Sequence, residues 1–261
     1  MANLHKLLFC TILAVCVSGH WLAAQQPFTF RPTIDIPVEQ SGANLDLAWA
    51  GGMNSAQFGT MELNGDELAD LMVFDKTTNK ISTFINTGSD YQYDPQYEYA
   101  FPENLNSWLL LADYDCDGRK DLFTNTTFGL RVYRNTTVDQ LSFELVADPL
   151  LSESGGQMVN LQVGSSDLPA ITDVDGDGDL DILTFRFATG SSVEYHQNQS
   201  MENNGNCQQL EFKLVTNRWG DFEECECEDY AFGTSCSNPG GRTQHAGGKS
   251  LLVFDQDFDC L

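Results

Sequence analysis

A short acidic unit recurs along this chain, and its recurrence constrains the fold more than any other feature of the sequence. Each copy spans nine residues and carries carboxylate or amide side chains at its first, third, fifth and ninth positions. Three full copies occupy residues 62–70, 113–121 and 173–181, and a truncated fourth copy occupies 255–261. Repetition of this kind predicts an architecture built from copies of one structural module.

Apolar segments of strand length flank the acidic stretches. The segment 109–112 leads into the second copy, and 71–74 follows the first. A second alternating segment then ends at an asparagine turn, as at Asn135. A further strand-like segment has nearly the same sequence at 141–146 and 210–215. Runs of this length and composition indicate β-strands. The sequence therefore predicts an all-β chain, a β-propeller of repeated four-stranded blades that is incomplete in this chain.

The predicted organisation places the propeller repeats in residues 43–261, after a linker or first strand at 25–42. A closed propeller needs about four to eight blades, and the sequence has only three complete units. Because the chain stops inside an acidic stretch, we expect the sequence to be part of something longer. An insertion at 217–248, rich in Cys, Gly, Asn and acidic residues, is expected to be a loop excursion and not a blade.

The N-terminus predicts a signal peptide at residues 1–24. Lys6 supplies the positive start, an apolar run follows, and Ala23 and Ala24 form a small-residue cleavage site. The apolar run is too short to span a bilayer comfortably, and no second membrane-spanning segment follows. A lipoprotein signal that uses Cys16 is the alternative. We expect an exported protein, secreted or on the cell surface.

The charge balance restricts the partners. The chain has 38 acidic and 13 basic residues, a formal net charge of −25. Such a surface repels phosphate backbones, so nucleic acid is not an expected partner. Self-repulsion also destabilises the compact state, and a divalent cation is the simplest compensation.

The acidic stretches have the chemistry of calcium loops. Alternating carboxylates supply hard oxygen ligands when a glycine at the sixth position, here Gly118 or Gly178, folds the chain back sharply. The first copy has Glu67 at that position. An EF-hand is excluded because it needs a glutamate at the twelfth position and flanking helices. The alternative is that the acidic turns merely face water.

We predict Ca²⁺ as the cofactor, with ligands in every copy. The predicted ligands are Asp113, Asp115, Asp117 and Asp121 in the second copy, Asp173, Asp175, Asp177 and Asp181 in the third, Glu62, Asn64, Asp66 and Asp70 in the first, and Asp255, Asp257 and Asp259 in the truncated one. The first and fourth copies depart most from the pattern.

The order of apolar strand, Asp-x-Asp-x-Asp-Gly-x-x-Asp, apolar strand and aromatic-x-x-Asn turn resembles the VCBS and FG-GAP repeats, which are related to the blades of the integrin α-subunit propeller. The resemblance covers most of residues 43–261 apart from the insertion. It implies a β-propeller with calcium in the blade loops, found in secreted or surface proteins of adhesive or carbohydrate-associated character. The function of such repeats varies widely, so the resemblance does not name a partner.

We expect a secreted or cell-surface calcium-binding protein that acts as a binding or adhesion module for an extracellular protein or glycan. One alternative is a part, catalytic or non-catalytic, of an extracellular carbohydrate-active enzyme, and another is a structural spacer. Catalysis is not expected, because nearly every clustered aspartate belongs to a metal loop and no catalytic motif appears. His196 is expected at the surface. Aromatic residues such as Tyr91 could stack on sugars, but strand packing explains their alternation equally well.

Six cysteines lie outside the predicted signal peptide, and an even number in an exported chain favours disulfides. Cys225 and Cys227, with nearby His245, could instead bind zinc, but their spacing matches no standard ligand pattern. Disulfides within the insertion are therefore the preferred interpretation, with the pairing left open.

Overall fold

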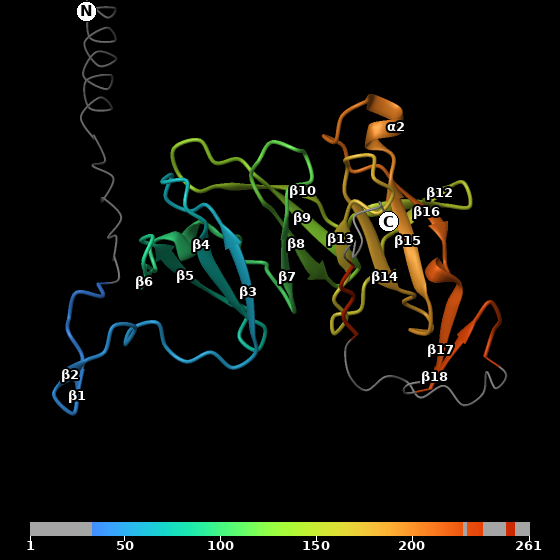
Figure 1. Ribbon diagram of the computed structural model, residues 1–261. Helices are drawn as coiled ribbons and strands as arrows, with labels where there is room; N and C mark the ends of the chain where they lie inside the picture. The colour runs from blue at the N-terminus through green and yellow to red at the C-terminus, as the bar shows by residue number, and fades with distance from the viewer. Residues whose placement is uncertain (1–32, 227–228, 237–248, 254–261) are drawn as a thin grey trace, which may run out of the picture. The chain divides into compact units, whose positions relative to one another are not determined.

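The computed structural model describes residues 33–226, 229–236 and 249–253 (Figure 1). The chain divides into two units, 1–33 and 34–261, and everything below concerns the second. The predicted signal peptide at 1–24, the truncated acidic stretch with Asp255, Asp257 and Asp259, and the residues Cys227 and His245 lie outside the described residues. None of the helices in the described part of the chain has the length and apolar character that crossing a membrane requires.

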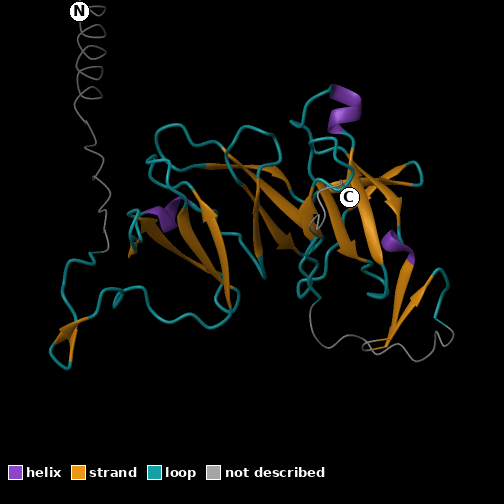
Figure 2. Ribbon diagram, in the orientation of Figure 1, coloured by secondary structure: helices purple, strands orange, loops and turns teal. Residues whose placement is uncertain are grey.

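Strands dominate the described residues, which confirms the all-β prediction (Figure 2). The helical elements are short: η1 (Tyr97–Ala100), α2 (Ser200–Asn204) and η2 (Trp219–Asp221). Ahead of the first large sheet, β1 (Glu39–Gln40) and β2 (Ala43–Asn44) form a small antiparallel hairpin with exposed side chains.

The first acidic loop lies in a four-stranded antiparallel sheet with the strand order β3-β4-β5-β6 (Figure 1). Its strands are β3 (Ala56–Met61), β4 (Asp70–Asp75), β5 (Lys80–Asn86) and β6 (Tyr91–Tyr93). The loop joins β3 to β4, and Met61 lies opposite Asp70 in the register. The two ends of the acidic stretch are therefore held together by the β3–β4 ladder.

The second sheet repeats this plan with the order β7-β8-β9-β10. Its strands are β7 (Leu109–Ala112), β8 (Asp121–Thr126), β9 (Gly129–Asn135) and β10 (Phe143–Ala147). Ala112 lies opposite Asp121, so the second acidic loop is closed in the same way as the first.

The third sheet contains the same four-strand unit with an addition that the sequence did not predict. The repeated strands are β13 (Ala170–Thr172), β14 (Asp181–Phe185), β15 (Val193–Asn198) and β16 (Phe212–Thr216), and Thr172 lies opposite Asp181. A hairpin of β11 (Leu151–Ser154) and β12 (Gln157–Asn160) joins the free edge, because β11 pairs in parallel with β16. In all three sheets, the acidic loop thus joins the first and second of four successive antiparallel strands.

Part of the insertion is more regular than the expected loop. β17 (Phe222–Glu226) and β18 (Asp229–Phe232) form an antiparallel hairpin. The ring of Phe222 lies 6.2 Å from the rings of both Tyr230 and Phe232, and such cross-strand aromatic pairs stabilise a hairpin. Within the described residues, this hairpin is a separate two-stranded sheet.

Buried cores lie between successive sheets. The core shared by the first and second sheets includes Met72, Phe74, Leu109, Leu122 and Tyr133. The core shared by the second and third sheets includes Phe123, Val132, Leu150, Ile182 and Phe212. Each fully buried side chain of this kind contributes about 1.5–3 kcal/mol. The repeated sheets therefore pack against one another in the order of the chain.

The described residues after the insertion continue this order. The N–H of Leu251 donates to the carbonyl of Leu168 at 3.0 Å, and the N–H of Leu168 donates to the carbonyl of Lys249 at 2.6 Å. Ser250 forms a parallel bridge with Leu168, just ahead of β13. Residues 249–251 thus lie alongside the approach to β13.

Candidate metal centres in the acidic loops

The ninth-position aspartates connect each acidic loop to its sheet. In the second loop, Oδ2 of Asp121 accepts from the backbone N–H of Tyr114 at 2.9 Å, and Oδ1 accepts from the N–H of Asn135 at 2.7 Å. Asp70 and Asp181 accept the equivalent two bonds in the first and third loops, at 2.8–3.0 Å. All three aspartates are fully buried. In each unit, one carboxylate therefore joins the acidic loop to the asparagine that ends the third of the four repeated strands.

Burial raises the pKa of Asp121 and of Asp181 to about 7, although the backbone donors lower it. The neighbouring loop aspartates add to the rise. The pKa of Asp70 is also raised, with burial as the largest cause. A divalent cation beside such a group would favour its charged form.

The sixth loop position adopts the left-handed backbone conformation in all three copies. Gly118 has φ +87° and Gly178 has φ +101°, as the glycines in the sequence predicted. Glu67 takes the same conformation, with φ +66°, although a side chain there costs about 1–2 kcal/mol. The first loop thus turns like the others despite the missing glycine.

The second loop gathers three of its four predicted ligands. One oxygen from each of Asp113, Asp115 and Asp121 lies within 4.8 Å of the others. Asp115 is 5% exposed, and its Oδ1 has no hydrogen-bond partner among the described residues. A buried acceptor without a partner is unfavourable by about 1–3 kcal/mol, more for a charged one, so this oxygen is suited to a cation.

Two arginines partly neutralise the second loop. Arg134 pairs with Oδ2 of Asp115 at 2.7 Å, and Asp115 is the main reason that the pKa of Arg134 is raised. Arg119 forms an ion pair with Asp117, and its backbone N–H donates to the same carboxylate at 2.9 Å. Asp117 lies outside the group of three carboxylates, and its ion-pair partner is Arg119.

The third loop gathers carboxylates in two overlapping groups. Asp173, Asp175 and Asp181 form the counterpart of the group in the second loop. Asp175 and Asp177 also converge with Glu202, again within 4.8 Å. All four predicted ligands of this loop therefore belong to one group or the other.

Glu202 lies in α2 and was not predicted as a ligand. A sequence signal for it exists, since the stretch between Asn198 and Phe212 is longer than its counterpart between Asn135 and Phe143. Asp179 lies close by, and its pKa is raised to about 6. Burial is the largest cause, the backbone N–H of Met201 opposes it, and the charges of Asp177, Glu202 and Asp175 add to the rise.

The first loop gathers no such group within the residues that the structure describes. Its predicted ligands bond within the loop instead. Oε1 of Glu62 accepts from the N–H groups of Asn64 at 3.0 Å and Gly65 at 2.7 Å. The side-chain amide of Asn64 donates to Asp66 at 3.0 Å, while Asp70 holds the loop to the sheet.

The structure has two disulfides: one confirms the prediction of a disulfide within the insertion, and the other lies outside the insertion and was not predicted. Cys225 pairs with Cys236 inside the insertion, and Cys116 pairs with Cys207. Because these four cysteines are paired, they are not free to bind zinc. The sulfur of Cys116 also lies 3.6 Å from the carbonyl oxygen of Gly178, so the second and third loops touch.

The position of His196 differs from the prediction. The side chain was expected at the surface, but it is 5% exposed, and its Nδ1 lies 2.8 Å from the hydroxyl oxygen of Ser152. The reason is the β11–β12 hairpin, which brings Ser152 beside the sheet and was not predicted from the sequence.

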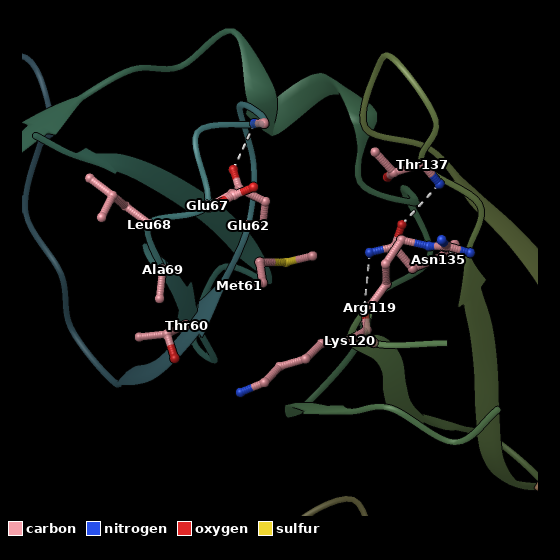
Figure 3. A pocket seen from close by; sticks show the side chains of 12 residues that line it. Thr60, Met61, Glu62, Glu67, Leu68, Ala69, Arg119, Lys120, Asn135 and Thr137 are labelled. Carbon is pink, nitrogen blue, oxygen red and sulfur yellow. Dashed lines mark hydrogen bonds between the residues drawn. The ribbon is translucent and has the colours of Figure 1, made fainter. Parts of the chain in front are cut away.

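A cleft of about 420 Å³ separates the first and second loops. One wall carries Glu62, Glu67 and Leu68, and the other carries Arg119 and Lys120. Figure 3 shows the Lys120 side chain extending into the space between the walls. The cleft therefore has acidic groups on one side and basic groups on the other.

A second groove, of about 460 Å³, lies beside β6 and the segment that precedes the first sheet. Its lining includes Trp49, Tyr91 and Tyr93. Trp49 is 47% exposed, whereas Tyr93 is buried and packs on the ring of Phe84 at 5.5 Å. Tyr93 is thus largely a packing residue, whereas Tyr91, which the sequence suggested could stack on sugars, remains accessible.

No protein-family model matches the chain, and no curated protein matches it. Among solved structures, the chain is similar to a lectin of Agrocybe aegerita described as recognising non-reducing terminal N-acetylglucosamine. The match has a TM-score of 0.37 and 18% sequence identity, and it covers 64% of this chain and 42% of the lectin chain. A TM-score of this size does not establish a shared fold, so no ligand is inferred from the likeness.

Proposed function

We propose that this chain is an exported calcium-binding repeat protein whose repeats are β-propeller blades of the FG-GAP and VCBS type. Antiparallel four-strand units that follow one strand order and pack in chain order support a propeller. The placement of residues 249–251 beside Leu168 supports a further unit after the third. The common ninth-position aspartates support one ancestral loop design for all three units.

The second and third loops bind Ca²⁺ in this proposal. The observation that carries it is the buried, unpartnered Oδ1 of Asp115 inside a convergent group of carboxylates. Asp113, Asp115 and Asp121 would hold one ion, and Asp173, Asp175 and Asp181 another. Calcium accepts about six to eight oxygens in an adaptable geometry, so backbone carbonyls and water would complete each shell. The ions would fasten β7 to β8 and β13 to β14.

Export is supported by two features. Both disulfides are of a kind that persists in oxidising compartments, and residues 1–24 have the pattern of a signal peptide. In an extracellular setting calcium is abundant, so weak sites with Kd of about 10⁻⁴ to 10⁻³ M would be occupied. Bound calcium would also offset part of the net charge of −25.

The role that we propose is binding or adhesion without catalysis. The buried carboxylates of the loops are engaged by backbone donors and, in this proposal, by cations, which leaves them poorly suited to proton transfer. The cleft between the first and second loops is the expected contact for a protein partner, since it offers both charge signs in one concave site.

The calcium proposal is tested by titrating the mature chain with CaCl₂ in a calorimeter. We expect at least two sites, with Asp115→Asn removing one and Asp173→Asn removing another. Asp139→Asn is the control, because Asp139 is exposed and lies outside the acidic loops. Absence of binding heat, together with a melting temperature that a chelator does not change, would refute calcium binding.

A glycan is the second candidate partner, and the groove with Trp49 and Tyr91 favours it. Exposed aromatic rings in a concave site offer flat apolar faces beside polar groups, which suits sugar rings. On a glycan array, Trp49→Ala should abolish any signal. Tyr99→Ala, which removes an exposed ring outside the groove, should retain it. Equal loss in both variants, or no signal for the unmodified chain, would remove this candidate.

A further inference from the structure

The third loop carries more carboxylate than the repeat pattern requires. Asp175, Asp177 and Glu202 converge within 4.8 Å, although Glu202 comes from α2 and not from the loop. The side-chain amide of Gln197 donates to Glu202 at 2.8 Å and also to Asp175. This amide is neutral, so it bridges the two carboxylates without neutralising either.

Asp179 supplies an independent observation. Its side chain is 1% exposed, and its Oδ2 accepts from the backbone N–H of Met201, next to Glu202, at 2.9 Å. Its Oδ1 has no hydrogen-bond partner within the described part of the chain, and the same holds for the buried Oδ2 of Asp177. A buried carboxylate oxygen without a donor is unfavourable, so one such oxygen within the convergent group and another close to it favour a cation at this place.

The charges around the loop point the same way. The corresponding region of the second loop contains Arg119 and Arg134, each paired with a loop aspartate. Within the described residues, no lysine or arginine forms an ion pair with Asp175, Asp177, Asp179 or Glu202. One divalent ion at the repeat's own site would leave this side of the loop strongly negative, because the excess carboxylates are additional to that site's ligands.

We propose that the third repeat binds two divalent cations, and that the second ion lies between the loop and α2, held by Asp175, Asp177 and Glu202. Asp175 would be shared between the two ions. The inference rests on the proposed calcium function and adds a ligand from outside the repeat. Carboxylate oxygens of this density suit Ca²⁺, which accepts many oxygen ligands. The second ion would fasten α2 to the loop, in addition to the bond between Asp179 and Met201.

The test compares the number of calcium ions bound by the mature disulfide-intact chain and by two variants, measured by equilibrium dialysis at saturating CaCl₂. Glu202→Gln should lower the count by one ion per chain. Glu211→Gln is the matched control: Glu211 lies between α2 and β16 and accepts from the side-chain amide of Asn203 in α2, but it is outside the convergent group. It should leave the count unchanged. Unchanged melting temperatures in chelator show that both variants fold.

The outcomes separate this inference from the general calcium proposal. If Glu202→Gln weakens binding but leaves the count unchanged, Glu202 serves the repeat's own ion and the second site is refuted. If Glu202→Gln changes neither, the second site is refuted and Asp115→Asn still tests the second loop. If the unmodified chain binds no calcium, both proposals fail.

Discussion

The second and third acidic loops share one backbone design but balance their charge differently. In both, a buried ninth-position aspartate accepts from two backbone N–H groups, one in the loop and one at the end of a strand. In the second loop, Arg119 and Arg134 pair with loop carboxylates. In the third loop, Glu202 adds a further negative charge. The backbone hydrogen bonds that shape the loop are therefore common to both repeats. The charge that a bound cation would have to balance differs between them.

The two loops are also physically connected. Cys116 of the second loop forms a disulfide with Cys207, which follows α2, and its sulfur lies 3.6 Å from the carbonyl oxygen of Gly178 in the third loop. Since α2 carries Glu202, the disulfide links the second loop to the segment that contributes to the third.

The largest expected effect concerns the shared design. Asp121→Ala leaves two buried backbone donors unpaired, and Asp181→Ala leaves the equivalent two unpaired. The hydroxyl of Tyr195, which donates to Asp181 at 3.1 Å, still has Asp175 as an acceptor at 3.5 Å. At about 2 kcal/mol for each unpaired donor, the free energy of unfolding should fall by about 4 kcal/mol in each variant. Denaturant unfolding in chelator measures both values. Asp113→Ala removes a half-buried loop carboxylate and should lower the free energy of unfolding far less. Equal losses in all three variants would contradict the shared design.

The next effect concerns the connection. Cys116 and Cys207 are 91 residues apart, whereas Cys225 and Cys236 are 11 apart. In the chain-entropy model, a longer closed loop gives a larger stabilisation, about 4.5 kcal/mol for the first bond and about 3 kcal/mol for the second. Replacing each pair by serine and measuring denaturant unfolding should reproduce that order. A reversed order would show that the link between the loops contributes little.

The smallest effect concerns the difference in charge. Arg134→Met removes the guanidinium beside Asp115 and keeps much of its apolar stem, so the second loop becomes more negative. The Arg134 side chain is 42% exposed, so water screens its charge. One charge about 4 Å away in water is worth about 1 kcal/mol, which is about a five-fold tighter Kd for Ca²⁺ at the second loop. Calorimetric titration measures the change. Arg186→Met is the control, because Arg186 faces Glu194 and not an acidic loop; weaker binding in Arg134→Met would show that the arginine supports the site.

Local pattern was sufficient to predict most of the strands. The segments 71–74 and 109–112 were predicted as strands and lie in β4 and β7, because alternation and apolar composition are properties of the chain itself. The turn at Gly178 was also predicted from local sequence, because glycine adopts a positive φ more readily than other residues. Position 67 shows the limit: glutamate occupies the same conformation because the surrounding loop imposes it.

The failures share one physical cause, which is contact between residues far apart in the sequence. His196 is buried because a hairpin that begins at Leu151 covers it, and the pairing of Cys116 with Cys207 spans two sheets. Glu202 was missed because α2 lies outside the repeat. Neither periodicity nor spacing records such contacts.

The sequence by itself determined the recurrence of the acidic loops, the strands on either side of them and the all-β class, because these depend on the order of side chains over a few residues. Only the tertiary structure decided which carboxylates converge, which oxygens are buried without a donor and which loops touch. Those properties depend on the packing of one sheet against the next, and a carboxylate binds a cation according to the oxygens that lie near it in space.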